Sequence, residues 1–196
     1  MSEQSTAAVS HIPAQSQRRK TLRLREYDYT TPGAYFVTIC VNNKKPILGK
    51  IVGEEIILAK VGEIVREVWH NLPGYYTTIE LDEFIVMPNH VHGIIWILGS
   101  SPPPDAVGAG LRPARSDREG LRPSPTKAHS LALPEIVRAF KSFSAREINK
   151  ETKGRNRFHW QRSYHDHVIR NEDNLYQHRA YIQNNPLKWA LDEYYQ

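Results

Sequence analysis

Residues 78–98 read TIELDEFIVMPNHVHGIIWIL and contain two strand-like runs separated by a short break. The first run, residues 78–86, places apolar side chains at alternating positions, which is the period of a β-strand. The second run, residues 90–98, is almost continuously apolar and rich in isoleucine. The break around Pro88 is short, and short breaks join strands that lie side by side. The stretch therefore predicts an antiparallel pair of strands.

The segments around this pair predict further strands and helices. Residues 60–72 carry apolar side chains at spacings of three and four, which is the period of an amphipathic helix, and Pro73-Gly74 is expected to end it. Asn171 is a plausible N-cap of a last helix that is expected to stop near Asn185, because Pro186 disfavours helical geometry in the residue before it. The other predicted elements are a strand at 35–41, a hairpin of 47–51 and 55–58, a helix with Pro134 in its first turn, and an extended segment at 158–169. This order predicts an α+β fold in which helices flank an antiparallel sheet.

The composition is typical of a soluble globular protein. The 196 residues are 40% hydrophobic and have a mean hydropathy of −0.56. No apolar run reaches the roughly 18 residues of a membrane-spanning helix, and the polar N-terminus lacks the apolar core of a signal peptide. We therefore expect a cytoplasmic protein without membrane contact. The single cysteine, Cys40, excludes an intrachain disulfide and a zinc site of several cysteines.

Charge is unevenly distributed along the chain. Residues 1–50 and 99–157 carry net charges of +5 and +6, whereas residues 51–98 carry −5 and residues 158–196 carry −1. Basic segments together with 10 tyrosines and 4 tryptophans suit a polyanion such as nucleic acid, although small proteins are also basic for solubility alone. Charge by itself therefore leaves both interpretations open.

Two segments lack the periodicity of a folded core. Residues 1–21 are predicted to form a disordered tail with a basic end. Residues 99–130 are dominated by Gly, Pro, Ser and Arg, and they contain Gly-Leu-Arg-Pro twice, so we expect a flexible low-complexity insertion. Residues 22–196 then form a single domain that this insertion interrupts.

Two His-x-His pairs are candidates for chemistry. Side chains at i and i+2 of a strand share a face, so His90 and His92 should project together at the start of a strand, at a sheet edge open to substrate, while Val91 points into the core. Two such imidazoles can anchor one divalent metal, although most His-x-His pairs do not. The second pair, in His165-Asp166-His167, has basic neighbours that favour phosphate over a cation, so a substrate-contact or structural role is preferred there.

A second constellation lies near the C-terminus. Tyr181 and Asn185 are four residues apart and share a face of the predicted last helix. A tyrosine can act as a covalent nucleophile, and an amide oxygen is a hard ligand suited to Mg²⁺ or Mn²⁺. Alone, the spacing is also compatible with ordinary packing and a helix stop.

Taken in order, the motifs resemble those of a known family. MPNHVHGII, the basic helix EIVRAFKSFS, then WQRSYHDHVIR and YIQNNP, preceded by RLREYDYTTPGAYFVTIC, resemble the REP-associated tyrosine transposases. These belong to the single-tyrosine HUH (His-hydrophobic-His) transposases. The resemblance runs from about residue 22 to about residue 191, apart from the insertion.

The resemblance implies a site and a reaction. It implies a ferredoxin-like HUH nuclease fold, His90, His92 and Asn185 as ligands of Mg²⁺ or Mn²⁺, and Tyr181 as the nucleophile. The implied substrate is single-stranded DNA, often beside a hairpin, and attack by Tyr181 would give a 5′-phosphotyrosine and a 3′-OH that can later reverse the step. The residues expected to contact DNA are Arg18, Arg19, Lys20, Arg23, Arg138, Lys141, Arg162, His167 and Arg170.

Two alternative functions and several details stay open. A domesticated relative would bind DNA repeats or hairpins without cutting them, and another HUH endonuclease would be a replication initiator or relaxase. Monomer and homodimer are both compatible with the sequence, as are attack by Tyr181 within its own chain or on a partner's site. The base that deprotonates Tyr181 is not identified by any motif.

Overall fold

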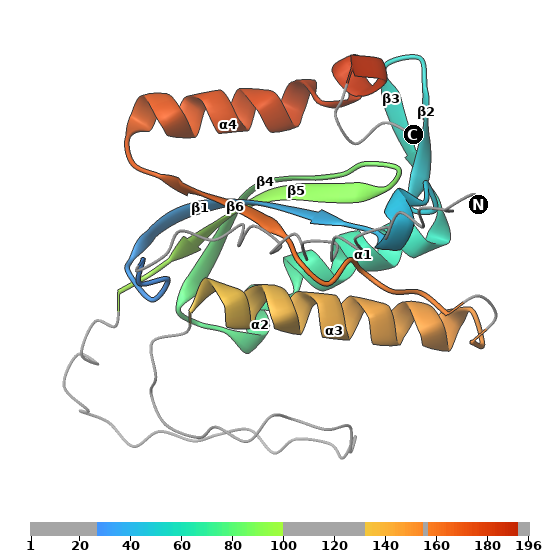
Figure 1. Cartoon of the computed structure of the whole chain (residues 1–196), viewed down its shortest axis with the longest axis horizontal. Coiled ribbons are helices and arrows are strands. Elements are labelled where there is room, and N and C mark those ends of the chain that lie inside the picture. Colours follow the sequence, from blue (N-terminus) through green and yellow to red (C-terminus); the bar gives the residue numbers. More distant parts are fainter. Residues whose placement is uncertain (1–26, 100–131, 155–156, 192–196) are drawn as a thin grey trace, which may run out of the picture.

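A four-stranded antiparallel sheet lies between two layers of helix (Figure 1). The computed structural model describes residues 27–99, 132–154 and 157–191. Helix α4 covers one face of the sheet, and α1 and α3 cover the other. Among the described residues, no helix combines the length and the apolar character needed to cross a membrane. The expected α+β fold, with helices flanking an antiparallel sheet, is confirmed.

The sheet has the strand order β4-β5-β1-β6, so β5 and β1 are central. Its strands are β1 (Gly33–Cys40), β4 (Ile79–Val86), β5 (His90–Ile97) and β6 (His165–Ile169). A separate hairpin consists of β2 (Gly49–Val52) and β3 (Glu55–Leu58). The α-helices are α1 (Lys60–His70), α2 (Leu72–Tyr75), α3 (Leu133–Glu151) and α4 (Glu172–Asn184), and short 3₁₀ helices cover Asn42–Lys44 and Pro186–Leu191.

Alternation along the strands divides the core into two halves. In β1, Tyr35, Val37 and Ile39 pack toward α1 and α3, whereas Ala34 and Phe36 pack toward α4. Val91 lies in the larger half, as predicted for the residue between the two histidines. The remaining side chains of β1 and β5, which point to the other face of the sheet, therefore form a second surface that faces α4.

The predicted strand pair is present, with β4 and β5 antiparallel, and Asn171 caps α4 by accepting a hydrogen bond from the backbone N–H of Asn174. Pro73 and Gly74 do not end a helix but lie inside the short helix α2, where proline fits the first turn. The expected stop of the last helix near Asn185 is confirmed, since α4 ends at Asn184. Asn185 nevertheless keeps helical dihedral angles (φ −61°, ψ −40°) before Pro186, because the chain continues into the 3₁₀ helix.

The extended segment expected at 158–169 forms a regular strand over β6 only, preceded by one bridge between Val41 and Trp160. The predicted tail at 1–21 and nearly all of the predicted insertion at 99–130 lie outside the described residues.

Candidate catalytic site

His90 and His92 form a buried pair beneath α4. Their Nε2 atoms are 2.8 Å apart, and the two side chains are 0% and 1% exposed. The prediction that both project from the same face of a strand is confirmed. The prediction of a position at the sheet edge is wrong, because β5 lies between β4 and β1, although His92 lines a cavity beneath α4.

Neighbouring oxygen atoms orient both imidazole rings. Asn89 donates from its Nδ2 to the backbone oxygen of Lys44 at 3.1 Å, which turns its Oδ1 toward Nδ1 of His90 at 2.8 Å. Since Oδ1 can only accept, His90 donates from Nδ1 and its Nε2 carries the lone pair. Thr38 Oγ1 lies 2.8 Å from Nδ1 of His92, and its hydroxyl can donate or accept a hydrogen bond there. Oxygen partners of this kind typically fix metal-binding histidines.

Burial keeps both rings neutral. Desolvation, followed by the nearby charge of Lys44, lowers the pKa of His90 to about 3. Desolvation and then the neighbouring His90 hold the pKa of His92 well below its usual value. A neutral imidazole can donate a lone pair to a cation, so the pair suits a metal at neutral pH.

Tyr181 of α4 lies directly over this pair. Its Oη is 3.5 Å from Nε2 of His92, the two rings meet edge-on with centroids 5.1 Å apart, and the tyrosine is 41% exposed. Phe36 packs against both rings. The fold therefore brings the phenol of Tyr181 close to the two imidazoles, although Tyr181 and His92 are 89 residues apart in the sequence.

Asn185 is the C-cap residue of α4, one turn beyond Tyr181, and it is buried. The 3₁₀ helix that follows returns over the site, since the Trp189 ring centroid is 5.9 Å from that of His90. An amide oxygen would complement two imidazole nitrogens in a mixed nitrogen and oxygen donor set for a small divalent cation. Within the described ranges, no group of three His, Cys, Asp or Glu side chains forms an alternative metal site.

A cavity of about 460 Å³ leads from Tyr181 along the edge of the sheet, between β6 and α4. His165 and His167 of the second His-x-His motif line it, together with Gln177 and His178 of α4. His167 contacts Asn174 Oδ1 at 3.1 Å and stacks on the His178 ring. Asp166 instead accepts a hydrogen bond from Tyr29, a residue of the core half that faces α1 and α3.

Helix α4 is fixed to the sheet by an ion pair that the sequence did not reveal. Arg179 donates from Nε and Nη2 to the two carboxylate oxygens of Asp82, at 2.9 and 2.6 Å, and Trp96 donates to the same carboxylate at 2.9 Å. Asp82 lies where the register of β4 shifts against β5. Arg179 lies two residues before Tyr181 on α4. Its ion pair with Asp82 therefore helps to position the phenol over the histidines.

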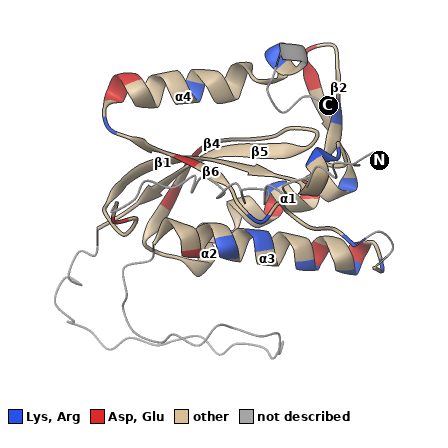
Figure 2. Ribbon diagram, in the orientation of Figure 1, with Lys and Arg blue, Asp and Glu red and all other residues tan. Residues whose placement is uncertain are grey.

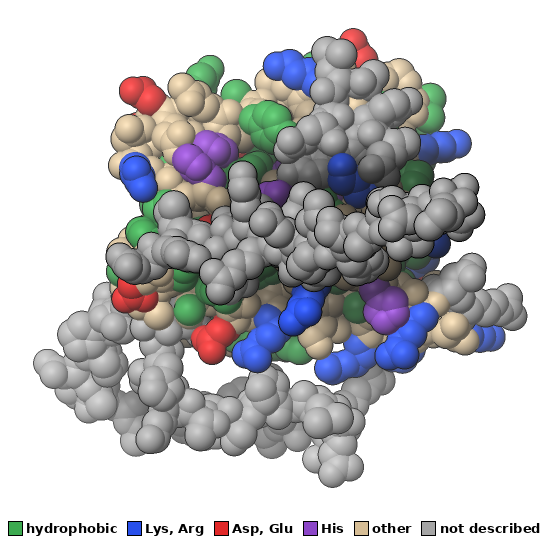
Figure 3. Space-filling view, in the orientation of Figure 1, with side chains coloured by type: hydrophobic (Ala, Val, Ile, Leu, Met, Phe, Trp, Pro, Cys, Tyr) green, Lys and Arg blue, Asp and Glu red, His purple; other side chains and the backbone are tan. Residues whose placement is uncertain are grey.

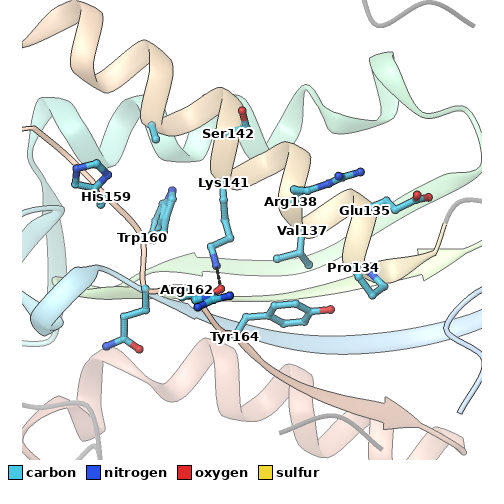
Figure 4. Close-up of a pocket in the computed structure, with 12 residues that line it drawn as sticks. Pro134, Glu135, Val137, Arg138, Lys141, Ser142, His159, Trp160, Arg162 and Tyr164 are labelled. Atoms are coloured by element: carbon cyan, nitrogen blue, oxygen red, sulfur yellow. Dashed lines mark hydrogen bonds between the residues drawn. The ribbon is translucent and has the colours of Figure 1, made fainter. Parts of the chain in front are cut away.

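The predicted DNA contacts that the structure describes lie on two sides of the sheet. Arg138, Lys141 and Arg162 meet on the α3 side, where they line a second cavity of about 680 Å³ (Figure 4). His167 lies on the α4 side, and Arg170 is exposed between β6 and α4. Arg18, Arg19, Lys20 and Arg23 lie outside the described residues.

Comparison with known proteins supports the resemblance found in the sequence and the fold. The family model described as "Transposase IS200 like" matches residues 126–185, which include Tyr181 and Asn185. An uncharacterized protein of Haemophilus influenzae is 35% identical over 177 residues, covering 90% of this chain and 93% of that protein. The solved structure of a REP-associated tyrosine transposase bound to a REP hairpin superposes with a TM-score of 0.53 at 17% identity, covering 87% of this chain and 76% of the other.

Residues 126–185 thus match the IS200-like transposase family, and the fold is that of a solved REP-associated tyrosine transposase, as the resemblance in the sequence implied. Both findings support a transposase-like domain.

Proposed function

We propose that this protein is a metal-dependent transposase that cuts and rejoins single strands of DNA, with Tyr181 as the nucleophile. One observation carries the proposal: the phenol oxygen of Tyr181 lies 3.5 Å from a ring nitrogen of the neutral, buried His90 and His92 pair. The exposure of Tyr181 to the cavity beside β6 leaves room for a substrate phosphate.

The donor set fits a divalent cation held by His90, His92 and the side-chain oxygen of Asn185. Both histidines are neutral, and the partners of their Nδ1 atoms point both Nε2 atoms toward one position. When bound, Mg²⁺ or Mn²⁺ supplies positive charge that polarises the oxygens of the scissile phosphate. Without it, the C-terminal end of α4 would repel a phosphate, because helix C-termini carry partial negative charge.

The protein supplies mainly position and a nucleophile. The Tyr181 oxygen forms a bond to phosphorus, the bond from phosphorus to the 3′ oxygen breaks, the phenol loses its proton and the leaving 3′ oxygen gains one. The products are a 5′-phosphotyrosine and a 3′-OH, and attack by a 3′-OH on the phosphotyrosine reverses the step and joins strands. Phosphoryl transfer depends chiefly on such positioning, which Phe36 and the Asp82–Arg179 pair provide.

The proposed substrate is single-stranded DNA beside a hairpin. The solved relative holds a REP hairpin, and this chain has basic side chains on both sides of β6. Arg138, Lys141, Arg162 and Arg170 would contact phosphates, which positions DNA without reading its sequence. His167 would contact the strand closer to Tyr181.

The test is a denaturing gel of the protein incubated with labelled hairpin-flanked single strands and Mn²⁺. The wild type should form a covalent adduct, and Tyr181→Phe should not, although it should still bind the DNA. Tyr176→Phe is the matched control, because Tyr176 is on the same helix and 75% exposed. DNA binding without an adduct in the wild type would favour a domesticated binding protein instead.

A further inference from the structure

Two cavities flank the edge strand β6, and consecutive residues of one segment line them. Residues 159–162 and Tyr164 line the cavity on the α3 side, and His165 begins the lining of the cavity on the α4 side. Among the strands that the structure describes, β1 alone pairs with β6, so this strand forms one edge of the sheet. In Figure 1 this edge lies between α4 and α3. A ligand that follows the segment would pass around the edge of the sheet from one cavity to the other.

The cavity on the α3 side has the chemistry of a phosphate-binding surface. Arg138, Lys141 and Arg162 line it against a single acidic side chain, Glu135. Figure 4 shows Lys141 reaching from α3 toward the segment after Trp160, and its Nζ donates to the backbone oxygens of Arg162 and Ser163 at 3.1 and 3.3 Å. Figure 2 marks several Lys and Arg positions along α3, and Figure 3 shows Lys and Arg side chains gathered on the visible face of the molecule over this helix.

The cavity on the α4 side differs, since its lining includes no Lys or Arg of residues 27–99, 132–154 or 157–191. Its lining consists of rings, from Phe36, His167, His178 and Tyr181, with polar groups such as Gln177 at its rim. Asp166 is the acidic residue in this lining, and its carboxylate accepts a hydrogen bond from Tyr29. Aromatic rings beside polar groups accommodate an unpaired nucleobase, and base stacking of this kind tolerates many sequences.

We propose that single-stranded DNA crosses the edge strand β6, with backbone phosphates in the cavity on the α3 side and the nucleotide beside the scissile phosphate in the cavity on the α4 side. This route rests on the proposed function, because it ends at Tyr181. Single-stranded DNA suits the route better than a duplex, because bending a duplex with a persistence length of about 50 nm through about 40–90° costs about 1–6 kcal/mol. The positive charge of the cavity on the α3 side is complementary to the negative charge of a polyanion such as a DNA backbone.

The experiment measures binding separately from cutting. In a Tyr181→Phe background, fluorescence anisotropy compares a short oligonucleotide that covers only the cleavage site with oligonucleotides extended on its 5′ or its 3′ side. The test variant is Arg138→Ala with Arg162→Ala. The control is Lys50→Ala with Arg66→Ala, which removes the same charge at two exposed positions that line neither cavity.

We expect one extension to tighten binding, and the test variant to lose about tenfold in affinity for that oligonucleotide while the short one is unaffected. The slope of log Kd against log salt should fall by about 1.4, which corresponds to two phosphates of a single strand. The control should change both oligonucleotides equally and slightly.

Equal losses of DNA affinity in the test and control variants would overturn the route. So would a test variant that loses as much affinity for the short oligonucleotide as for the extended one. Tight binding of a fully duplex extension at the same affinity would overturn it as well. Failure of the proposed function looks different: the wild type then forms no adduct, whatever the binding series gives.

A second arm probes the cavity on the α4 side. An abasic nucleotide at one position next to the scissile phosphate should weaken binding of the short oligonucleotide, and Gln177→Ala with His167→Ala should remove that dependence. Indifference of the wild type to abasic nucleotides on both sides of the phosphate would contradict base binding in this cavity.

Discussion

Replacing Arg179 by alanine tests what holds the nucleophile in place. The substitution removes both hydrogen bonds from Arg179 to Asp82 and leaves the carboxylate with Trp96 and the backbone N–H of Glu83. Helix α4 then loses its ion pair to β4 and keeps the contact between Gln183 and Glu83 at 2.9 Å. We expect both the stability of the fold and the position of Tyr181 to suffer.

The magnitude follows from the Asp82 carboxylate, which is 11% exposed. The hydrogen bond from Arg179 is the largest cause that lowers the pKa of Asp82 from 3.8 to about 2, with burial opposing it. A shift of this size corresponds to about 2 kcal/mol of folding free energy. Trp96 and Glu83 supply part of it, and the Arg179 side chain is 42% exposed and screened by water, so we expect a loss of about 1 kcal/mol.

The pH dependence of the free energy of unfolding should also reveal the Asp82–Arg179 ion pair. A lowered carboxylate pKa stabilises the fold at pH values above about 4, and this contribution is lost as the pH falls from about 4 to about 2. Urea unfolding of the wild type across that range should therefore show a decline that Arg179→Ala shows less steeply. Parallel curves for the two proteins would mean that the ion pair does not contribute.

The catalytic readout separates positioning from stability. At saturating DNA, adduct formation by Arg179→Ala should slow by about tenfold, which corresponds to about 1.4 kcal/mol in the barrier, while DNA affinity in the Tyr181→Phe background stays the same. Arg179→Lys should recover part of the rate. Gln183→Ala, which removes the neighbouring contact, is the control and should have little effect. An unchanged rate in Arg179→Ala would refute the role of this pair in positioning Tyr181.

Three further predictions concern the site and the core. Thr38→Val removes the hydroxyl beside Nδ1 of His92 and should weaken Mn²⁺ binding, measured by calorimetry, by about tenfold, whereas an unchanged affinity would mean that Thr38 does not orient the ring. His92→Ala should abolish adduct formation at any Mn²⁺ concentration, and undiminished yield would remove the histidine pair from the reaction. Gly93→Ala would press a methyl group into the Trp69 ring and should cost about 2 kcal/mol in urea unfolding, while a stability equal to that of the wild type would show that the ring can move.

Local patterns predicted the parts of the site that depend on one element. The period of a strand is enough to place His90 and His92 together, and the period of a helix is enough to place Tyr181 and Asn185 on one face. The same strand period also predicts that the side chain of Asp166 points to the face opposite those of His165 and His167. The hydrogen bond from Tyr29 to Asp166 agrees with this, while the two histidines line the cavity on the α4 side.

The remaining features depend on contacts between distant segments. The pair is buried because β5 lies between β4 and β1, and this strand order is not encoded in any single stretch of sequence. Thr38 orients His92 only because β1 pairs with β5 in one register. The same holds for Asp82 and Arg179, which are 97 residues apart and meet only once α4 lies on the sheet. Trp189 reaches the site because Asn185 stays helical before Pro186.

The most direct measurement is mass spectrometry of the covalent adduct after nuclease and trypsin digestion. Trypsin cuts after Arg179 and Lys188, so Tyr181 lies in the peptide AYIQNNPLK, and Tyr176 lies in the preceding peptide NEDNLYQHR. The 5′-phosphonucleotide should be found on AYIQNNPLK, and only when Mn²⁺ or Mg²⁺ is present. A nucleotide on the peptide of Tyr176, or one attached to AYIQNNPLK without any divalent cation, would contradict a site built from Tyr181 and the two histidines.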